Sequence, residues 1–359
     1  MLSIGIVGLP NVGKSTLFNA LTDNEILAAN YPFATIEPNT GTVAVPDERL
    51  QNLAELYNSQ KVLPANVKFI DIAGLVAGAS KGEGLGNQFL AHIRTCSAIL
   101  QVVRAFDQGG VLRSDSSRDP EHDISVIKTE LILADLQTVT NRLPKTEKLA
   151  KSDPKLKPQL DALIIAKDLL DSGKAIFESA EYSTLNAQLA DLQLMTAKPI
   201  LYLFNIDDDK LGDTEFKEKL SQMVKPATAL FVCAKLEDEL RSLDEPDRAE
   251  MLASYGQATS GLDQVIHAAY DMLGLQSYLT AGEKEVRAWT IHKGDTAPQA
   301  AGVIHGDFEK GFIAAQVIDY DDLMAAGSEQ AAKAAGKMRT EGKTYVMRPG
   351  DIVEFRFNV

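Results

Sequence analysis

The residues best suited to chemistry lie near the start of the chain, in the segment Gly8-Leu-Pro-Asn-Val-Gly13-Lys14-Ser15. Its glycines allow backbone N–H groups to converge on phosphate oxygens. Lys14 places a positive charge against the outer phosphates, and the Ser15 hydroxyl is a ligand for Mg²⁺. An apolar run precedes this loop, and a stretch compatible with a helix follows it. The pattern predicts a P-loop that binds a nucleotide through Asn11, Val12, Gly13, Lys14, Ser15 and Thr16.

Two later segments supply the other parts of a nucleotide switch. Thr35 lies in a loop, where a threonine can reach Mg²⁺ and the γ-phosphate. The apolar stretch 67–70 ends at Asp71, whose carboxylate is expected to support the Mg²⁺ site from the second shell. Gly74 follows and can offer its N–H to the γ-phosphate. We therefore expect Lys14, Thr35 and Gly74 to be catalytic, and Ser15, Thr35 and Asp71 to form the metal site.

Leu75 occupies a place where many Ras-like enzymes have a glutamine that orients the attacking water. A leucine side chain has no donor or acceptor, so unassisted hydrolysis is expected to be slow. Asn11 suggests one source of assistance, because its amide oxygen could hold a monovalent cation beside the β–γ bridge. Stimulation by K⁺ is the resulting hypothesis.

Base recognition is expected in the segment Asn205-Ile206-Asp207-Asp208. Guanine-specific switches have Asn-Lys-x-Asp here, and Ile206 replaces the lysine while Asp208 keeps the acid. A second segment, Cys233-Ala234-Lys235, corresponds to the Ser-Ala-Lys that flanks the base in GTPases. These residues alone leave the choice between ATP and GTP open and slightly favour GTP.

Charge sets limits on the partners of this 359-residue chain. A formal net charge of −14 excludes a bulk binder of polyanions, so any contact with nucleic acid requires a local basic patch. One candidate is the stretch Arg142–Lys157, where six cations face only Glu147 and Asp153. A solvated helical tip and an RNA contact are both compatible with this pattern.

The remaining composition is that of a cytoplasmic protein. No apolar run reaches membrane-spanning length, and the first residues lack the basic and apolar regions of an export signal. Cys96 and Cys233 are far apart and fit a reducing compartment better than a disulfide framework. We expect a cytoplasmic location and no membrane partner.

Hydrophobic patterns divide the chain into three parts. Strands and helices alternate over residues 1–118, as in a parallel sheet covered by helices, and strand signals return at 199–204 and 229–232. Helical spacing between them predicts an inserted antiparallel hairpin, broken at its far end by Pro144, Pro154 and Pro158. Strand signals at 286–291, 311–317 and 353–359 predict a small mixed α/β module, with a helix over 329–337.

The chain resembles the Obg-like P-loop ATPases of the YchF type, from end to end. Besides the P-loop, the matching segments are Tyr31-Pro-Phe-Ala-Thr-Ile-Glu-Pro-Asn39, Asp71-Ile-Ala-Gly-Leu-Val-Ala-Gly-Ala-Ser-Lys-Gly-Glu-Gly-Leu-Gly86, Val286-Arg-Ala-Trp-Thr290, His305-Gly-Asp-Phe-Glu-Lys-Gly-Phe312 and Phe355-Arg-Phe-Asn-Val359. The resemblance implies a Rossmann-like P-loop domain at 1–118 and 195–275. It also implies an inserted helical (coiled-coil) domain at 119–194 and a C-terminal β-grasp, ubiquitin-like TGS domain at 277–359.

The resemblance also implies an activity. The family has lost the lysine of Asn-Lys-x-Asp, so ATP is expected over GTP, with adenine contacts through Asn205 and the Ile206 backbone, beside Cys233 and Ala234. Association with the ribosome, at the large subunit, is implied as well, and the basic tip Arg142–Lys157 is the candidate for touching ribosomal RNA. A GTPase of the same architecture and a nucleotide-stabilised adaptor without enzymatic activity stay open as alternatives.

Two positions depart from the family pattern. Asp208 stands where the family usually has a glutamate, which restores the nominal guanine-reading acid. Arg113 stands where the family typically has a histidine, on the loop after Arg104-Ala-Phe106. An arginine cannot act as a base but could stabilise developing phosphate charge. A solvated arginine beside Asp115 explains the same residue.

Overall fold

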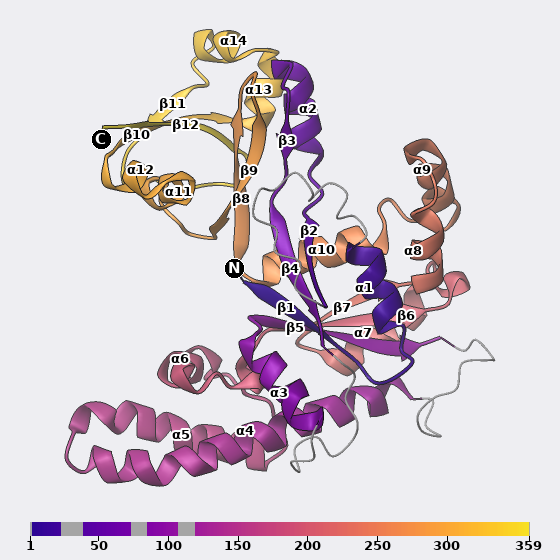
Figure 1. The fold of residues 1–359 in the computed structure, drawn as a ribbon, viewed down its shortest axis with the longest axis vertical. Helices are drawn as coiled ribbons and strands as arrows, with labels where there is room; N and C mark the ends of the chain where they lie inside the picture. Colours follow the sequence, from indigo (N-terminus) through magenta and orange to yellow (C-terminus); the bar gives the residue numbers. More distant parts are fainter. Residues whose placement is uncertain (1, 23–38, 73–84, 107–118, 359) are drawn as a thin grey trace. The chain divides into compact units, whose positions relative to one another are not determined.

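A computed structural model describes residues 2–22, 39–72, 85–106 and 119–358. The chain divides into two compact units (Figure 1). The first unit comprises Met1–Thr42 and Lys68–Val265, and the second comprises Val43–Val67 and Ile266–Val359. The sequence-based boundaries differ in one respect, because residues 43–67 belong with the C-terminal part of the chain. The division into three domains stays a prediction.

The first unit is built on a six-stranded sheet in the order β2-β4-β1-β5-β6-β7. Its strands are β1 (Ser3–Val7), β2 (Thr40–Ala44), β4 (Asn66–Asp71), β5 (Ala98–Ala105), β6 (Ile200–Ile206) and β7 (Thr228–Val232). β1 pairs in parallel with β4 and β5, and β6 pairs in parallel with β5 and β7. The carboxyl ends of these five strands therefore meet at one edge, where ligands bind in open α/β sheets. The predicted α/β class is confirmed.

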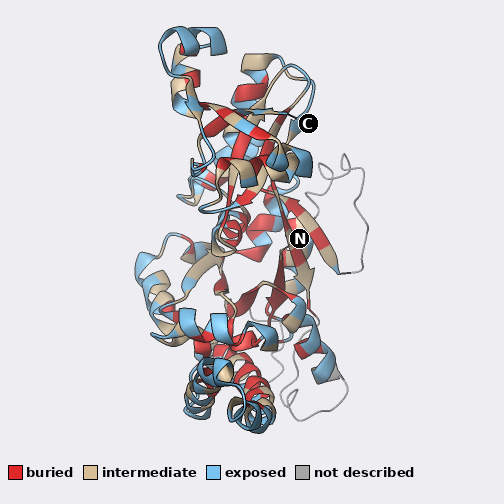
Figure 2. Ribbon diagram, turned by 90° about the vertical axis from the view of Figure 1, so that its left-hand side faces the viewer, coloured by how far each residue is buried: buried red, intermediate tan, exposed pale blue. Residues whose placement is uncertain are grey.

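Burial explains why the strands of this sheet are nearly continuous apolar runs. All five residues of β1 and the first seven of β5 are buried, as Figure 2 shows for the centre of the sheet. Parallel strands are covered on both faces, so their sequences do not alternate. The helices of the sheet region are α1 (Lys14–Thr22), α3 (Leu85–Thr95), α7 (Thr214–Val224), α8 (Ala234–Leu240), α9 (Glu245–Ser254) and α10 (Gly261–Met272).

A helical hairpin lies between β5 and β6 in the sequence, as predicted. Its helices are α4 (Pro120–Ala150) and α5 (Lys157–Asp171), and its short helical segments are η3 (Pro154–Leu156), η4 (Ile176–Glu178), α6 (Tyr182–Gln188), η5 (Ala190–Leu192) and η6 (Met195–Ala197). Asp119 caps α4 by accepting from the Glu121 amide. The buried Asp135 carboxylate accepts from the amides of Met195 and Thr196, at 3.1 and 2.7 Å, and so ties α4 to the segment that leads into β6.

The prediction that Pro144 breaks this helix was wrong, because α4 continues to Ala150. A proline inside a helix costs about 3 kcal/mol through its missing donor and its steric clash. Pro144 itself is exposed, and the buried residues Val139 and Thr146 flank it in the helix. Packing on both sides therefore holds the helix together across the proline. Pro154 and Pro158 do lie where the chain turns, in η3 and in the first turn of α5.

The second unit contains a mixed six-stranded sheet in the order β11-β10-β12-β8-β9-β3. Its strands are β3 (Val62–Leu63), β8 (Leu275–Ala281), β9 (Val286–His292), β10 (Phe312–Asp319), β11 (Arg339–Glu341) and β12 (Asp351–Phe357). Its helices are α2 (Glu48–Tyr57), α11 (Ala297–Ile304), α12 (Gly306–Lys310), α13 (Tyr320–Ala326) and α14 (Glu329–Ala334). The predicted mixed α/β module is confirmed, and its assignment as a TGS domain stays a prediction.

The end of the chain shows the alternation that its sequence predicts. In β12, Glu354 and Arg356 are exposed, whereas Val353 is buried and Phe355 is half-buried. Tyr278 of the neighbouring strand β8 is fully buried, and its ring meets that of Phe355 edge-on at 5.6 Å. Among the residues that the structure describes, every helix is too short or too polar to cross a lipid bilayer.

Candidate nucleotide-binding site

The P-loop connects the end of β1 to the first turn of α1. Gly13 has a φ of +94°, a conformation that costs residues with a Cβ about 1 kcal/mol or more. A Cβ at Gly13 would also lie 2.4 Å from the Nδ2 atom of Asn205, which leaves no room for it. The Leu17 amide donates to the Gly13 carbonyl at 3.0 Å, so the helix starts at this point. Conformation and space therefore both require glycine here.

Lys14 and Asp71 meet at the edge where the parallel strands end. Asp71 is the last residue of β4 and is aligned with Ile6 of β1. The Lys14 ammonium forms an ion pair with Asp71 Oδ1, and the two side chains are only 11% and 17% exposed. Partial burial strengthens an ion pair relative to one in open water. The predicted phosphate-binding cation and metal-site carboxylate are thus brought together.

The residues present fit a magnesium site of the P-loop kind. Ser15 and Thr16 are exposed in the first turn of α1, next to Lys14 and its Asp71 partner. Hydroxyl and carboxylate oxygens are the donors that Mg²⁺ prefers, and it usually takes few protein ligands beside phosphate oxygens and water. Within the described ranges, no group of three or more His, Cys, Asp or Glu side chains could hold a metal by itself. This donor set fits a metal shared with a bound polyphosphate.

The side-chain amide of Asn205, in β6, connects the P-loop to the start of α8. Asn205 is 4% exposed near the end of β6. Its Nδ2 donates to the Val12 carbonyl at 3.0 Å, and its Oδ1 accepts from the Ala234 amide at 3.0 Å. The P-loop and the start of α8 are therefore fixed to each other through this one residue. The sequence predicted that Asn205 contacts the base, but it did not predict these two hydrogen bonds. The one feature of the sequence that pointed to them was an asparagine at the end of a buried strand.

The other residues of the predicted base site differ in how deeply they are buried and in their polarity. Ile206 is 1% exposed and belongs to the apolar core, so only its backbone is suited to meet a base. Asp208 is half-buried at the start of η7 (Asp208–Lys210), and its Oδ1 accepts from the Asp209 amide at 3.0 Å. Cys233 is buried at the N-cap of α8, and burial raises the pKa of its thiol. At neutral pH this cysteine therefore packs as a small apolar side chain.

Glu237 is a buried carboxylate that sequence reasoning did not find. It lies on α8 with 4% exposure and accepts from the Gly261 amide at the start of α10, at 2.7 Å. Burial raises the pKa of Glu237 to about 7, although the amides of Gly261 and Leu262 favour its charged form. The contact fixes α8, which begins at Ala234 directly after Cys233. Partners 24 residues apart leave no local pattern, so only the folded chain reveals them.

Several predicted residues lie outside the part of the chain that the structure describes. They are Thr35, Gly74, Leu75 and Arg113. Asn11 is described, with an exposed side chain and a φ of +63°, and its role in holding K⁺ stays a prediction. The structure thus brings together the P-loop, Asp71, Asn205 and the Cys233–Ala234 segment.

Comparisons with known proteins agree with this architecture. A family model described as a 50S ribosome-binding GTPase matches residues 3–141, and the model YchF-GTPase_C, described as a protein of unknown function, matches residues 275–358. The ribosome-binding ATPase YchF of Bacillus subtilis is 48% identical, with 100% of each chain covered. The ribosome-binding ATPase YchF of Escherichia coli O157:H7 is also 48% identical, with 99% of each chain covered.

More distant relatives extend the match. Obg-like ATPase 1 of Gallus gallus is 42% identical over 99% of this chain and 92% of its own. The solved structure of the Schizosaccharomyces pombe YchF GTPase superposes with a TM-score of 0.87 at 38% identity, covering 99% of this chain and 97% of that one. These matches extend over the full length of the chain, and the structure places a P-loop at the edge of a parallel sheet. The chain is therefore a member of the YchF family of P-loop nucleotide hydrolases.

Proposed function

We propose that this protein is a cytoplasmic, ribosome-associated ATPase that hydrolyses ATP to ADP and phosphate and acts as a nucleotide-dependent switch in translation or its regulation. The observation that carries the proposal is the Lys14–Asp71 ion pair beside the glycine-framed loop, at the carboxyl edge of a parallel sheet. The printed names of the bacterial relatives, ribosome-binding ATPases, support the substrate and the partner.

Each residue of the site has a role in this proposal. The amides of the P-loop and the Lys14 ammonium bind the phosphates, Ser15 and Thr35 hold Mg²⁺, and Asp71 supports that ion from the second shell. Bound Mg²⁺ would neutralise charge that develops on the phosphate oxygens. Lys14 exchanges its contact with Asp71 for the outer phosphates when the nucleotide binds. Gly74 senses the γ-phosphate through its N–H.

The preference for ATP over GTP rests on the base loop. Ile206 replaces the lysine of the guanine motif, and its buried side chain leaves backbone edge contacts that adenine can use. The S. pombe structure is titled a GTPase, and Asp208 keeps an acid where guanine is read. Calorimetric titration with ATP, ADP, GTP and GDP decides between the two, and tighter binding of the guanine nucleotides would contradict the proposal. Asp208→Asn is expected to lower GTP affinity about threefold or more and to spare ATP.

Hydrolysis itself separates the enzyme from an adaptor that only binds nucleotide. We expect slow phosphate release by the protein alone and faster release with ribosomes present. No release in either case would favour the adaptor. Turnover in KCl and in NaCl at matched ionic strength tests the K⁺ role of Asn11, which equal rates would rule out.

The basic tip of the hairpin is the proposed contact with ribosomal RNA of the large subunit. Arg142 is paired with Asp191 at 2.9 Å, so the exposed charge consists of lysines. These are Lys145, Lys148, Lys151, Lys155 and Lys157. Replacing Lys148, Lys151 and Lys155 by glutamate is expected to weaken co-sedimentation with ribosomes, and the difference from the unsubstituted protein is expected to be largest at low salt. A matched control replaces the exposed lysines Lys61, Lys219 and Lys310, and equal pelleting of both triple variants would refute the contact.

A further inference from the structure

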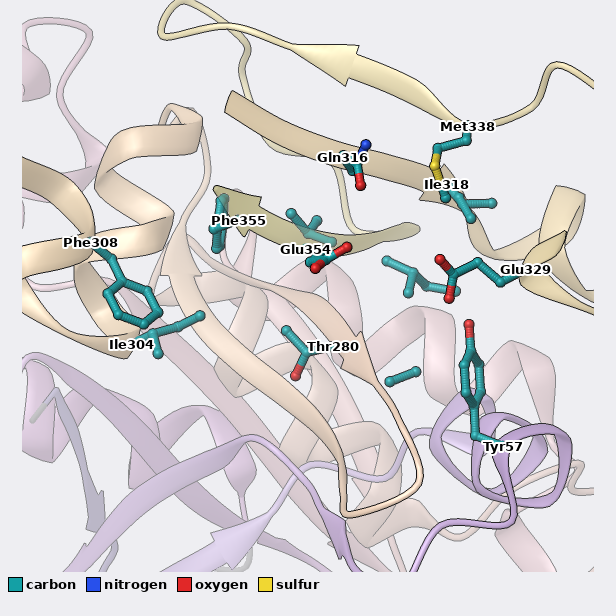
Figure 3. A pocket seen from close by; sticks show the side chains of 13 residues that line it. Tyr57, Thr280, Ile304, Phe308, Gln316, Ile318, Glu329, Met338, Glu354 and Phe355 are labelled. Carbon is teal, nitrogen blue, oxygen red and sulfur yellow. The ribbon is translucent and has the colours of Figure 1, made fainter. Parts of the chain in front are cut away.

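The sheet of the second unit is split between two of its neighbouring strands. β8 and β12 run parallel but share a single registered pair, Leu279 with Ile352. β8 pairs with β9 along its whole length, and β12 pairs with β10 in the same way. Past the shared pair, the residues 280–281 of β8 and 353–355 of β12 line a cavity of about 500 Å³ (Figure 3).

This split leaves part of a strand edge without a partner. Val353, Glu354 and Phe355 are registered with β10 on one side, and no other described strand pairs with them on the side of β8. Strand edges of this kind present backbone donors and acceptors to any extended chain. An added segment can bond to the backbone of β12 while its side chains alternate between the two faces of the sheet.

One face of the split carries its two carboxylates, beside the apolar Ile318 and Ile352, which lie on the same side of the sheet as Glu354. Glu329 and Glu354 are the charged residues of the lining, which contains no lysine or arginine among the described residues. Gln316 lies opposite Glu354 in the sheet, and the Tyr57 hydroxyl points toward the Glu329 carboxylate (Figure 3). Burial raises the pKa of Tyr57 to about 12, and the neighbouring Glu329 adds to this effect. A cation is the natural complement to these groups.

The other face is apolar. Ile304 of α11, Phe308 of α12 and Phe355 of β12 line one end of the cavity, and all three are half-buried. Because side chains of neighbouring strands project to the same face in register, a segment beside β12 meets the polar Glu354 on one face and the apolar Val353 and Phe355 on the other. The surface therefore selects an alternation of basic and apolar residues.

We propose that the split between β8 and β12 binds an extended segment of a partner protein in which basic and apolar residues alternate, by addition of a strand to β12. A second copy of this chain is a poor occupant, because its net charge is −14. The phosphates of a nucleic acid would be repelled by Glu329 and Glu354. The proposal does not depend on the nucleotide site, so either can fail without the other.

The test uses the full-length protein and the peptide (Arg-Val)₃-amide with a fluorescent dye on its N-terminus, followed by fluorescence anisotropy. We expect saturable binding that weakens about tenfold or more in the double variant Glu329→Gln, Glu354→Gln, as the loss of two charge pairs implies. The control Glu250→Gln removes one exposed carboxylate from the first unit and is expected to leave affinity unchanged. A peptide methylated at alternate backbone nitrogens keeps the side chains but cannot pair as a strand, and we expect it not to bind.

Three results would overturn the proposal. The first is equal affinity of the double variant and the unsubstituted protein, and the second is equal affinity of the methylated and unmethylated peptides. The third is displacement of the peptide by spermine or by a single-stranded RNA with the same dependence on Glu329 and Glu354, since that would assign the site to another class of ligand. Circular dichroism of both variants confirms that they are folded before affinities are compared.

Discussion

The proposed phosphate side and the proposed base side of the nucleotide site lie at the same edge of one sheet, yet they are built in different ways. The phosphate side is a continuous segment in which Gly13, Lys14 and Ser15 follow one another, and its shape comes from local backbone conformation. The base side consists of loops that follow β6 and β7, and Asn205 holds them to the P-loop through two hydrogen bonds. The residues proposed to bind phosphate are therefore neighbours in sequence, whereas the residues proposed to bind the base are held together by contacts between distant segments.

Lys14→Ala is the strongest test of the phosphate side. The variant loses the only charge that the P-loop itself brings to the outer phosphates, so we expect ribosome-stimulated phosphate release to fall about a hundredfold or more. The exposed Lys219→Ala on α7 is the control. Retention of more than a tenth of the activity would show that the local segment does not carry the chemistry.

Gly13→Ala tests whether the close approach of Gly13 to Asn205 constrains both the phosphate side and the base side. Its methyl group would meet Asn205 Nδ2 at 2.4 Å in a backbone conformation with a φ of +94°. We expect nucleotide affinity to fall tenfold or more, and the free energy of unfolding in urea to fall by about 2–4 kcal/mol. Gly212→Ala has open space around it and should change neither quantity. A Gly13 variant as stable as this control would contradict the close approach.

Asn205→Ala separates positioning from base contact. The substitution leaves the Val12 carbonyl and the Ala234 amide without their partner, at about 1–3 kcal/mol for each buried group. If Asn205 acts by holding the loops, calorimetry will show ATP and GTP weakened by the same factor, about tenfold. Asn205→Asp keeps the acceptor for Ala234 and should recover part of that loss. A loss confined to one nucleotide would assign the side chain to the base.

Glu237 offers a pH-dependent test of the base side. Because folding raises the pKa of this carboxyl from 4.5 to about 7, the stability it contributes is complete below pH 4.5 and is lost as the pH rises through 7. The loss is at most about 3 kcal/mol, by proton linkage. Glu237→Gln keeps an acceptor for the Gly261 amide and does not titrate. Its stability in urea should therefore fall less over this range than that of the unsubstituted protein.

The control for that measurement lies on the same helix. Glu239→Gln replaces an exposed carboxylate and should retain the full pH dependence. Parallel stability profiles for Glu237→Gln and the unsubstituted protein would show that α8 is not anchored through this group. Nucleotide affinity measured over the same pH range then shows whether the Glu237–Gly261 contact also affects the loops proposed to bind the base.

Much of the candidate site could be predicted from local signals, although the roles of its residues stay predictions. A P-loop is predicted by glycines and a lysine at fixed spacing. Asp71 is predicted to belong to the site because it lies at the end of an apolar strand. The strands of the parallel sheet, the helical hairpin and the alternating strand β12 follow from hydrophobic periodicity, which burial imposes directly on sequence. The resemblance to the family was likewise predicted from local segments, and the full-length matches confirm it.

The remaining features depend on residues that the sequence keeps far apart. Asn205 can bond to Val12 only because β6 ends beside the P-loop. Glu237 accepts from the Gly261 amide only when α8 and α10 are packed together. Pro144 stays within α4 because tertiary packing outweighs a local preference. The sequence by itself determined which elements form and where the proposed phosphate-binding loop lies. Tertiary structure decided the partners of the buried polar groups, the place of residues 43–67 and the split between β8 and β12, because these arise where non-adjacent segments meet.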